Sequence, residues 1–193
     1  AAQRYGDLLA GSPLHLVTER AAKALLDTVN PAGLVAVCSV PDTSLSDVLA
    51  GRPTLLAVPV GVSEPGNAGT LIRVADAMSA HAVVLAGHSV DPYNGKCLSA
   101  SAGSIFSVPV VSESDGVGVV TQIRDAGLQV LATALDGDVS LDDAELAVPT
   151  AWLFGPEAHG LPADLVDLAT HRVHIPMRGG AESLNVASAA SIC

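Results

Sequence analysis

The chain has 193 residues, of which 49% are hydrophobic and only 3% are aromatic, so we expect one or two domains with an aliphatic core. No apolar run approaches the roughly 18 residues that a membrane-spanning helix needs, and the start of the chain lacks the basic and apolar regions of a signal peptide. The formal net charge of −11 is the opposite of the basic balance that most nucleic-acid-binding proteins carry.

Three cysteines, Cys38, Cys97 and Cys193, stand far apart and show no CxxC spacing. This pattern argues against a disulfide framework and against a zinc site, and we expect no metal. No histidine stands beside any of them in the sequence to activate a thiol. We therefore interpret them as buried or incidental thiols and expect a reducing, cytoplasmic location.

The hydrophobic pattern predicts elements along the whole chain. The first 53 residues predict a helix over 13–29, a buried strand over 33–40, and a short helix with a linker over 41–53. From residue 54 onward, strands and helices alternate. Strands are expected over 54–60, 82–87, 105–110, 128–135, 151–155 and 171–176. Helices are expected over 67–78, 94–103, 115–127, 162–169 and 183–192. This alternation predicts an α/β fold with a mostly parallel sheet and helices on both faces, whose ligands bind beyond the carboxyl ends of the strands.

The first notable loop after a strand contains the sequence NAGTLIRVADA. Asn67 is predicted to cap the following helix, and Gly69 leaves the first helical turn bare. Arg73 follows within two turns. A helix start with these groups is suited to an anion or a phosphate, although an ordinary cap with a surface arginine is the alternative.

The second loop has the sequence LFGPEAHGLP. Gly155 and Gly160 allow the backbone to approach a ligand closely, and Glu157 follows a buried strand. His159 is either a general base or a solvated loop histidine. The GxGxxG and GxxxxGK[ST] patterns are both absent, so a nucleotide-like ligand must be held in another way.

The third loop and its helix form the end of the chain, IPMRGGAESLNVASAASIC. A Gly-Gly turn precedes Ser183 and Asn185, which offer a hydroxyl and an amide at the helix start. These groups serve either as helix caps or as substrate contacts. The helix itself consists almost entirely of small residues, which allows another element to pack closely against it.

Taken together, the three loops closely resemble the motifs of the SpoU (TrmH-type) branch of the SPOUT RNA methyltransferases. The motifs occur in the family's order over about residues 54–193, and DPYNGKCLSASAGSIF between them also fits. The resemblance implies that the C-terminal part of the sheet forms a deep trefoil knot holding S-adenosylmethionine. It also implies methylation of a ribose 2′-hydroxyl of RNA by a homodimer, in which each active site is completed by the partner's first motif.

The resemblance also implies which residues act. The implied catalytic residues are Arg73, Asn67, Glu157, Ser183 and Asn185. The implied cofactor-binding residues are Thr133, Ala134, Gly155, Pro156, Glu157, Ile175, Met177 and Leu184. Because a guanidinium stays protonated, we assign Arg73 to gripping a phosphate and orienting the hydroxyl, which leaves the proton acceptor unassigned. Many relatives carry arginine where this chain has Ser99, so one contact with RNA phosphate is missing here.

In the members of this family that act on ribosomal RNA, a small α/β RNA-binding domain precedes the catalytic domain. Residues 1–52 resemble the last part of that RNA-binding domain, and residues 53–193 correspond to the catalytic domain. The RNA-binding domain favours 23S rRNA as the substrate. One alternative is a tRNA 2′-O-methyltransferase, whose simple members lack that domain. Others are a non-catalytic RNA-binding or ribosome-assembly protein that keeps the cofactor pocket, and a small-molecule nucleotide-binding protein.

Overall fold

The computed structural model describes residues 10–25, 33–41, 43–156 and 159–193. The chain divides into two units, Ala1–Val40 and Pro41–Cys193. The family resemblance places the domain boundary twelve residues later, after residue 52, and the helix that lies between the two positions belongs to the second unit. Within the described residues, no helix is both long enough and apolar enough to cross a membrane.

The described part of the first unit contains a single regular element, α1 (Glu19–Leu25). Thr18 Oγ1 accepts a hydrogen bond from the Ala21 amide at the start of this helix, and Lys23 pairs with Glu19 one turn away. The strand predicted over 33–40 is wrong: these residues form no regular structure, and Val37 is fully exposed. A strand needs both a hydrogen-bonded neighbour and an apolar surface to cover, and the described residues of this unit supply neither.

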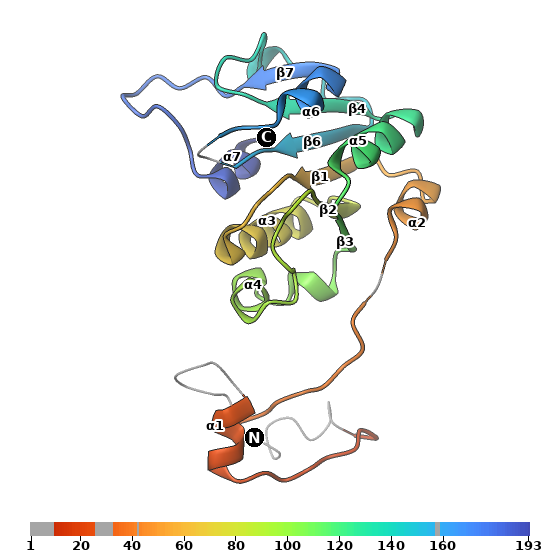
Figure 1. Cartoon of the computed structure of the whole chain (residues 1–193), viewed down its shortest axis with the longest axis vertical. Coiled ribbons are helices and arrows are strands. Elements are labelled where there is room, and N and C mark those ends of the chain that lie inside the picture. Colours follow the sequence, from red (N-terminus) through yellow and green to blue (C-terminus); the bar gives the residue numbers. More distant parts are fainter. Residues whose placement is uncertain (1–9, 26–32, 42, 157–158) are drawn as a thin grey trace. The chain divides into compact units, whose positions relative to one another are not determined.

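The second unit is built on one sheet of seven strands, all of whose pairs are parallel. The strands are β1 (Leu55–Pro59), β2 (Ala82–Ala86), β3 (Val110–Glu113), β4 (Gln129–Thr133), β5 (Val139–Ser140), β6 (Thr150–Phe154) and β7 (His171–His174). Across the sheet they lie in the order β3-β2-β1-β6-β4-β7-β5, and Figure 1 labels each of these strands except β5. Every residue of β2 and β6 is buried, as expected for parallel strands covered on both faces.

Helices cover both faces of this sheet. They are α2 (Leu45–Ala50), α3 (Pro65–Ala77), α4 (Gly95–Ser101), α5 (Gly116–Asp125), α6 (Ala163–Leu168) and α7 (Val186–Ile192), with two short 3-10 turns, η1 (Ser104–Phe106) and η2 (Leu141–Asp143). One apolar cluster joins α2, α5 and α6 to one face, and a second joins α3, α4 and α7 to the other. Figure 1 shows these two groups of helices on opposite sides of the strands. The predicted α/β class is confirmed.

Two of the strands, β3 and β5, differ from the sequence prediction. The strand predicted over 105–110 is displaced, because Gly103 at φ +95° starts η1, which buries Ile105, and pairing with β2 begins only at Val110. The strand β5 was not predicted, since two residues are too few to show a period of two.

The most unusual connection in the sheet joins β4 to β5. β7 lies between these two strands, and Thr133 of β4 and Val139 of β5 both pair with Val173. Residues 134–138 must therefore cross β7 and cover about 9.5 Å, which is two strand spacings. The crossing is tight, because a Cβ added to Gly137 would lie 2.6 Å from the carbonyl carbon of Val173 and 2.7 Å from the amide nitrogen of His174.

Candidate active site

An open pocket lies at the carboxyl ends of β4, β6 and β7. The lining residues are Thr133, Ala134, Leu135, Phe154, Gly155, Pro156, Gly160, Val173, Ile175, Met177, Ser183, Leu184, Val186 and Ala189. The lining is mainly aliphatic, and Thr133 Oγ1 is already donating to the Leu153 carbonyl. Polar recognition here therefore falls mainly to main-chain groups.

The pocket gathers the residues predicted to bind a cofactor. Thr133, Ala134, Gly155, Pro156, Ile175, Met177 and Leu184 all line it. Glu157, the remaining predicted residue, lies outside the described residues. The stretch FGPE, expected from the resemblance to hold the cofactor, also places Phe154 in the lining, whereas the sequence did not identify Leu135, which directly follows the predicted cofactor residue Ala134.

The loop that follows β6 is folded tightly on itself. A Cβ added to Gly155 would lie 2.6 Å from the backbone of Gly160 and Leu161, so a larger residue has no room there. Gly160 adopts φ +66°, and its amide donates to the Pro156 carbonyl at 2.8 Å. This compact turn brings main-chain groups to the pocket wall. His159 is exposed and is not among the residues lining the pocket.

The first and third sequence motifs meet at Asn185. Its side-chain oxygen caps α7 by accepting from the amides of Ala187 at 3.0 Å and Ser188 at 3.3 Å. Its side-chain nitrogen donates to Asn67 Oδ1 at 3.0 Å. Ser183 lines the pocket just before this cap.

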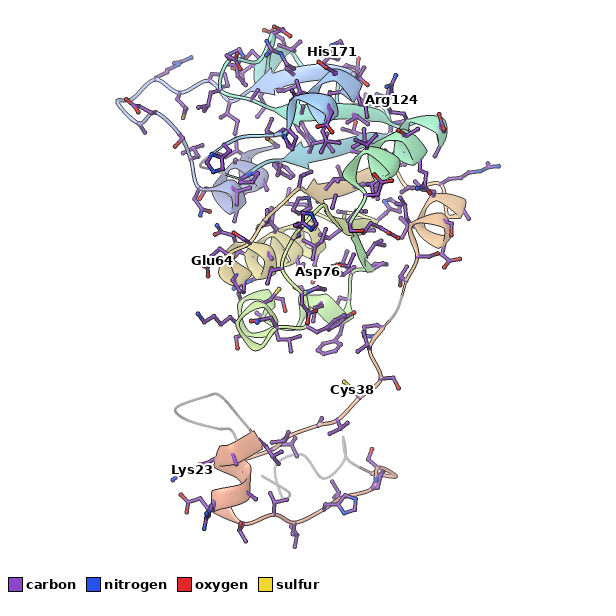
Figure 2. The ribbon with its side chains drawn as sticks, viewed as in Figure 1. Lys23, Cys38, Glu64, Asp76, Arg124 and His171 are labelled. Carbon is purple, nitrogen blue, oxygen red and sulfur yellow. The ribbon has the colours of Figure 1, made fainter. Side chains whose placement is uncertain are left out.

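The predictions that Asn67 caps the helix and that Gly69 leaves its first turn bare are wrong. Helix α3 begins at Pro65 and is capped by Glu64, which lies at the start of α3 in Figure 2, so Asn67 sits inside the first turn. Proline favours the first helical position, and the helix therefore begins at Pro65, two residues earlier in the chain than predicted. Gly69 is buried rather than bare, because α4 packs directly against it.

Arg73 lies on α3 with an exposed side chain. Arg73 does not line the pocket of its own chain. Of the residues predicted to be catalytic, the structure therefore brings Asn67 and Asn185 into contact but leaves Arg73 outside the pocket wall.

The loop after β4 carries an ionic cluster that the sequence did not predict. Arg172 donates from Nε to Asp138 Oδ2 at 3.1 Å and from Nη2 to Asp138 Oδ1 at 2.8 Å. The hydrogen bond from Arg172 lowers the pKa of the Asp138 carboxyl, and the same bond raises the pKa of the guanidinium. The partners stand 34 residues apart in the sequence, so no local pattern could reveal the pair.

A second, apolar pocket lies on the face covered by α3 and α7. Its lining includes Phe154, which also lines the first pocket, and the exposed side chains of Met78 and Ile192. Cys193 lines this second pocket, where burial raises the pKa of its thiol to about 12. The described residues contain no group of three His, Cys, Asp or Glu side chains able to hold a metal ion.

Comparison with known proteins gives a consistent result for most of the chain. The model of the SpoU rRNA Methylase family matches residues 54–193. The 23S rRNA (guanosine(2553)-2′-O)-methyltransferase RlmP of Bacillus subtilis is 36% identical over 186 residues, which cover 96% of this chain and 73% of that protein. The 23S rRNA (uridine(2479)-2′-O)-methyltransferase of Streptomyces viridochromogenes is 36% identical, and the match covers 83% of this chain but only 58% of that protein.

Solved structures show the same likeness. The SpoU methyltransferase AviRb from Streptomyces viridochromogenes, in complex with the cofactor AdoMet, superposes with a TM-score of 0.68 and 34% identity. The match covers 79% of this chain and 59% of that one.

Proposed function

The chain belongs to the SpoU rRNA Methylase family, and on this basis we propose that it transfers a methyl group from S-adenosylmethionine to a ribose 2′-hydroxyl of 23S rRNA. The observation that carries the proposal is the pocket beyond β4, β6 and β7, whose wall joins residues from separate motifs. AviRb, a relative with the same fold, binds AdoMet. The relatives RlmP and the Streptomyces enzyme are named as acting on 23S rRNA.

The lining of the pocket suits the chemistry of S-adenosylmethionine. An adenine ring and a ribose need apolar walls with main-chain hydrogen bonds, and Ile175 and Leu184 supply such walls beside the folded loop at Gly155. When bound, this cofactor supplies an activated methyl group on a sulfonium. The task of the protein is then to align the ribose oxygen and assist the loss of its proton.

We assign substrate orientation to the polar side chains of the first and third motifs. Asn185 Nδ2 donates to Asn67 Oδ1 at 3.0 Å, and Ser183, two residues before Asn185 in the chain, lines the pocket. Arg73 grips an RNA phosphate through its forked donors, which match phosphate better than the point charge of lysine does. Glu157 completes the set as an anchoring carboxylate.

We further propose that the protein is a homodimer in which Arg73 serves the partner's pocket. The exposed position of Arg73, outside the pocket wall of its own chain, supports this arrangement. The apolar groove beside α3 and α7, with exposed Met78 and Ile192, supplies a surface for the second copy. The first unit is proposed to be part of an RNA-binding domain.

We also propose that the C-terminal strands form a trefoil knot. The support is the crossing of residues 134–138 over β7, which sets β7 between two strands that follow each other in the chain. Such threading is rare among proteins, and it would bring all the pocket loops to one place.

The function is tested by incubating the protein with methyl-labelled S-adenosylmethionine and unmodified 23S rRNA, with tRNA in parallel. Label on 23S rRNA is expected, and it should disappear in Arg73→Ala. Arg73→Lys should also lose most of the label, because a single ammonium does not reproduce the fork. Label on tRNA alone would replace the proposed substrate, and cofactor binding without label on either RNA would indicate a non-catalytic protein.

A further inference from the structure

We propose that Arg172 is a positioning residue for the cofactor: it clamps the segment 134–138 where this segment crosses β7, and so sets one wall of the S-adenosylmethionine pocket. The inference rests on the proposed function, since it concerns the ligand of that same pocket. Its basis is the ionic cluster after β4 and the tight crossing at Gly137.

The crossing segment has few ways to stay in place on its own. It runs between Thr133 and Val139, which pair with opposite edges of Val173, and its side chains at 135, 136 and 138 are exposed. No described side chain of the segment is buried, so apolar packing contributes little to its position.

Polar contacts with β7 hold it instead. Arg172 grips Asp138 with two donors and also donates from Nη2 to the Asp136 carbonyl at 3.2 Å. His174 Nδ1 lies 2.8 Å from the Gly137 carbonyl oxygen. The Arg172 side chain is only 33% exposed, whereas that of Asp138 is 69% exposed, so the more buried β7 partner anchors the freer loop. A forked guanidinium fixes the direction of its partner as well as its distance.

The same segment begins at the pocket. Ala134 and Leu135 line the pocket, and the Ala134 amide donates to the Val173 carbonyl at 3.0 Å. Leu135 is 70% exposed and is followed directly by the clamped residues. Without the contacts from Arg172, this wall is expected to sample other positions, and binding of the cofactor must then order it. The free energy needed for this ordering weakens cofactor binding and raises Kd.

The test measures S-adenosylmethionine affinity by calorimetry and amide hydrogen exchange of residues 134–138, in the full chain. The variants are Arg172→Ala, Arg172→Lys and Asp138→Asn. Arg124→Ala is the matched control, because Arg124 is an exposed arginine at the end of α5, as Figure 2 shows. We expect Kd to rise about tenfold in Arg172→Ala, with faster exchange in the segment, and a smaller rise in Arg172→Lys. Arg124→Ala should match the wild type.

The outcomes separate this inference from the function on which it rests. Wild-type protein that does not bind S-adenosylmethionine would overturn the proposed function and the inference with it. If the wild type binds S-adenosylmethionine and both Arg172→Ala and Asp138→Asn bind it with the same Kd, the inference is overturned and the proposed function is not. A lower melting temperature with an unchanged Kd would reduce Arg172 to a structural role and overturn it as well. Asp138→Asn keeps the test decisive where Arg172→Ala does not fold.

Discussion

At the scale of single residues, Asn185 has two separable roles. Its oxygen caps α7 and its nitrogen reaches Asn67, 118 positions away in the chain. Serine caps helices about as well as asparagine but is too short to reach Asn67. We therefore expect Asn185→Ser to keep the free energy of unfolding within about 0.5 kcal/mol of the wild type while losing most of the methyl transfer.

Asn185→Ala is the companion variant, since it loses the cap as well as the contact. It should cost about 1 kcal/mol of stability, measured by urea unfolding, in addition to the lost activity. Full activity in Asn185→Ser would show that the contact with Asn67 has no part in the reaction.

The three cysteines are expected to differ in reactivity because they differ in burial. Burial raises the pKa of the Cys97 thiol to about 11, with a further contribution from nearby Asp91, and burial raises that of Cys193 to about 12. Only the thiolate is nucleophilic, and raising the pKa lowers its fraction at pH 8. Cys38 is exposed. With iodoacetamide at pH 8, peptide mass spectrometry should find Cys38 alkylated first and both Cys97 and Cys193 more slowly, and equal rates for all three would contradict the burial described here.

At the scale of elements, the contact between α3 and α4 depends on Gly69. A Cβ at this position would lie 2.4 Å from the Cys97 carbonyl oxygen and 2.6 Å from the Ala100 Cβ, so the two helices must move apart to admit it. Gly69→Ala is expected to lower the free energy of unfolding by about 1–3 kcal/mol, the usual cost of overpacking. Urea unfolding measures this directly.

The control for that prediction is Gly95→Ala at the start of α4. A Cβ there meets no atom within 4 Å, and the substitution should be neutral or stabilise by about 0.4–1 kcal/mol, because alanine restricts the unfolded chain. Equal destabilisation by Gly69→Ala and Gly95→Ala would mean that the loss in Gly69→Ala does not come from the close packing of α3 against α4.

The elements show how far the sequence alone leads. Strands such as β2 and β6 are fully buried, and their continuous apolar runs predicted them within a residue or so. The same apolar signal over 33–40 predicted a strand that does not form, since pairing depends on neighbours that the segment itself cannot supply. The pocket residues were found through motif resemblance, whereas the clamp between Arg172 and Asp138 depends on a chain crossing that no local pattern encodes.

At the scale of the whole molecule, the position of the unit boundary has a consequence for stability. Helix α2 lies after the boundary at Val40, and its Leu45 is only 3% exposed within the core of the sheet. In contrast, no described residue of 10–25 or 33–40 is buried. Deleting residues 1–40 is therefore expected to leave the unfolding free energy of the remaining chain within about 0.5 kcal/mol of its value in the full chain. Deleting residues 1–52 also removes α2 and should cost about 2–5 kcal/mol, the usual loss for a buried leucine.

Leu45→Ala in the full chain isolates the role of this side chain, and urea unfolding of all three proteins gives the comparison.

The two truncated chains also test the part assigned to the first unit. If residues 1–40 serve RNA binding, the chain that starts at Pro41 should bind S-adenosylmethionine as the full chain does and lose methylation of 23S rRNA, because the pocket lies wholly in 41–193. Equal stability of the two truncated chains would mean that α2 contributes little to the core. Unchanged rRNA methylation after deletion of 1–40 would remove the argument that this unit selects the RNA.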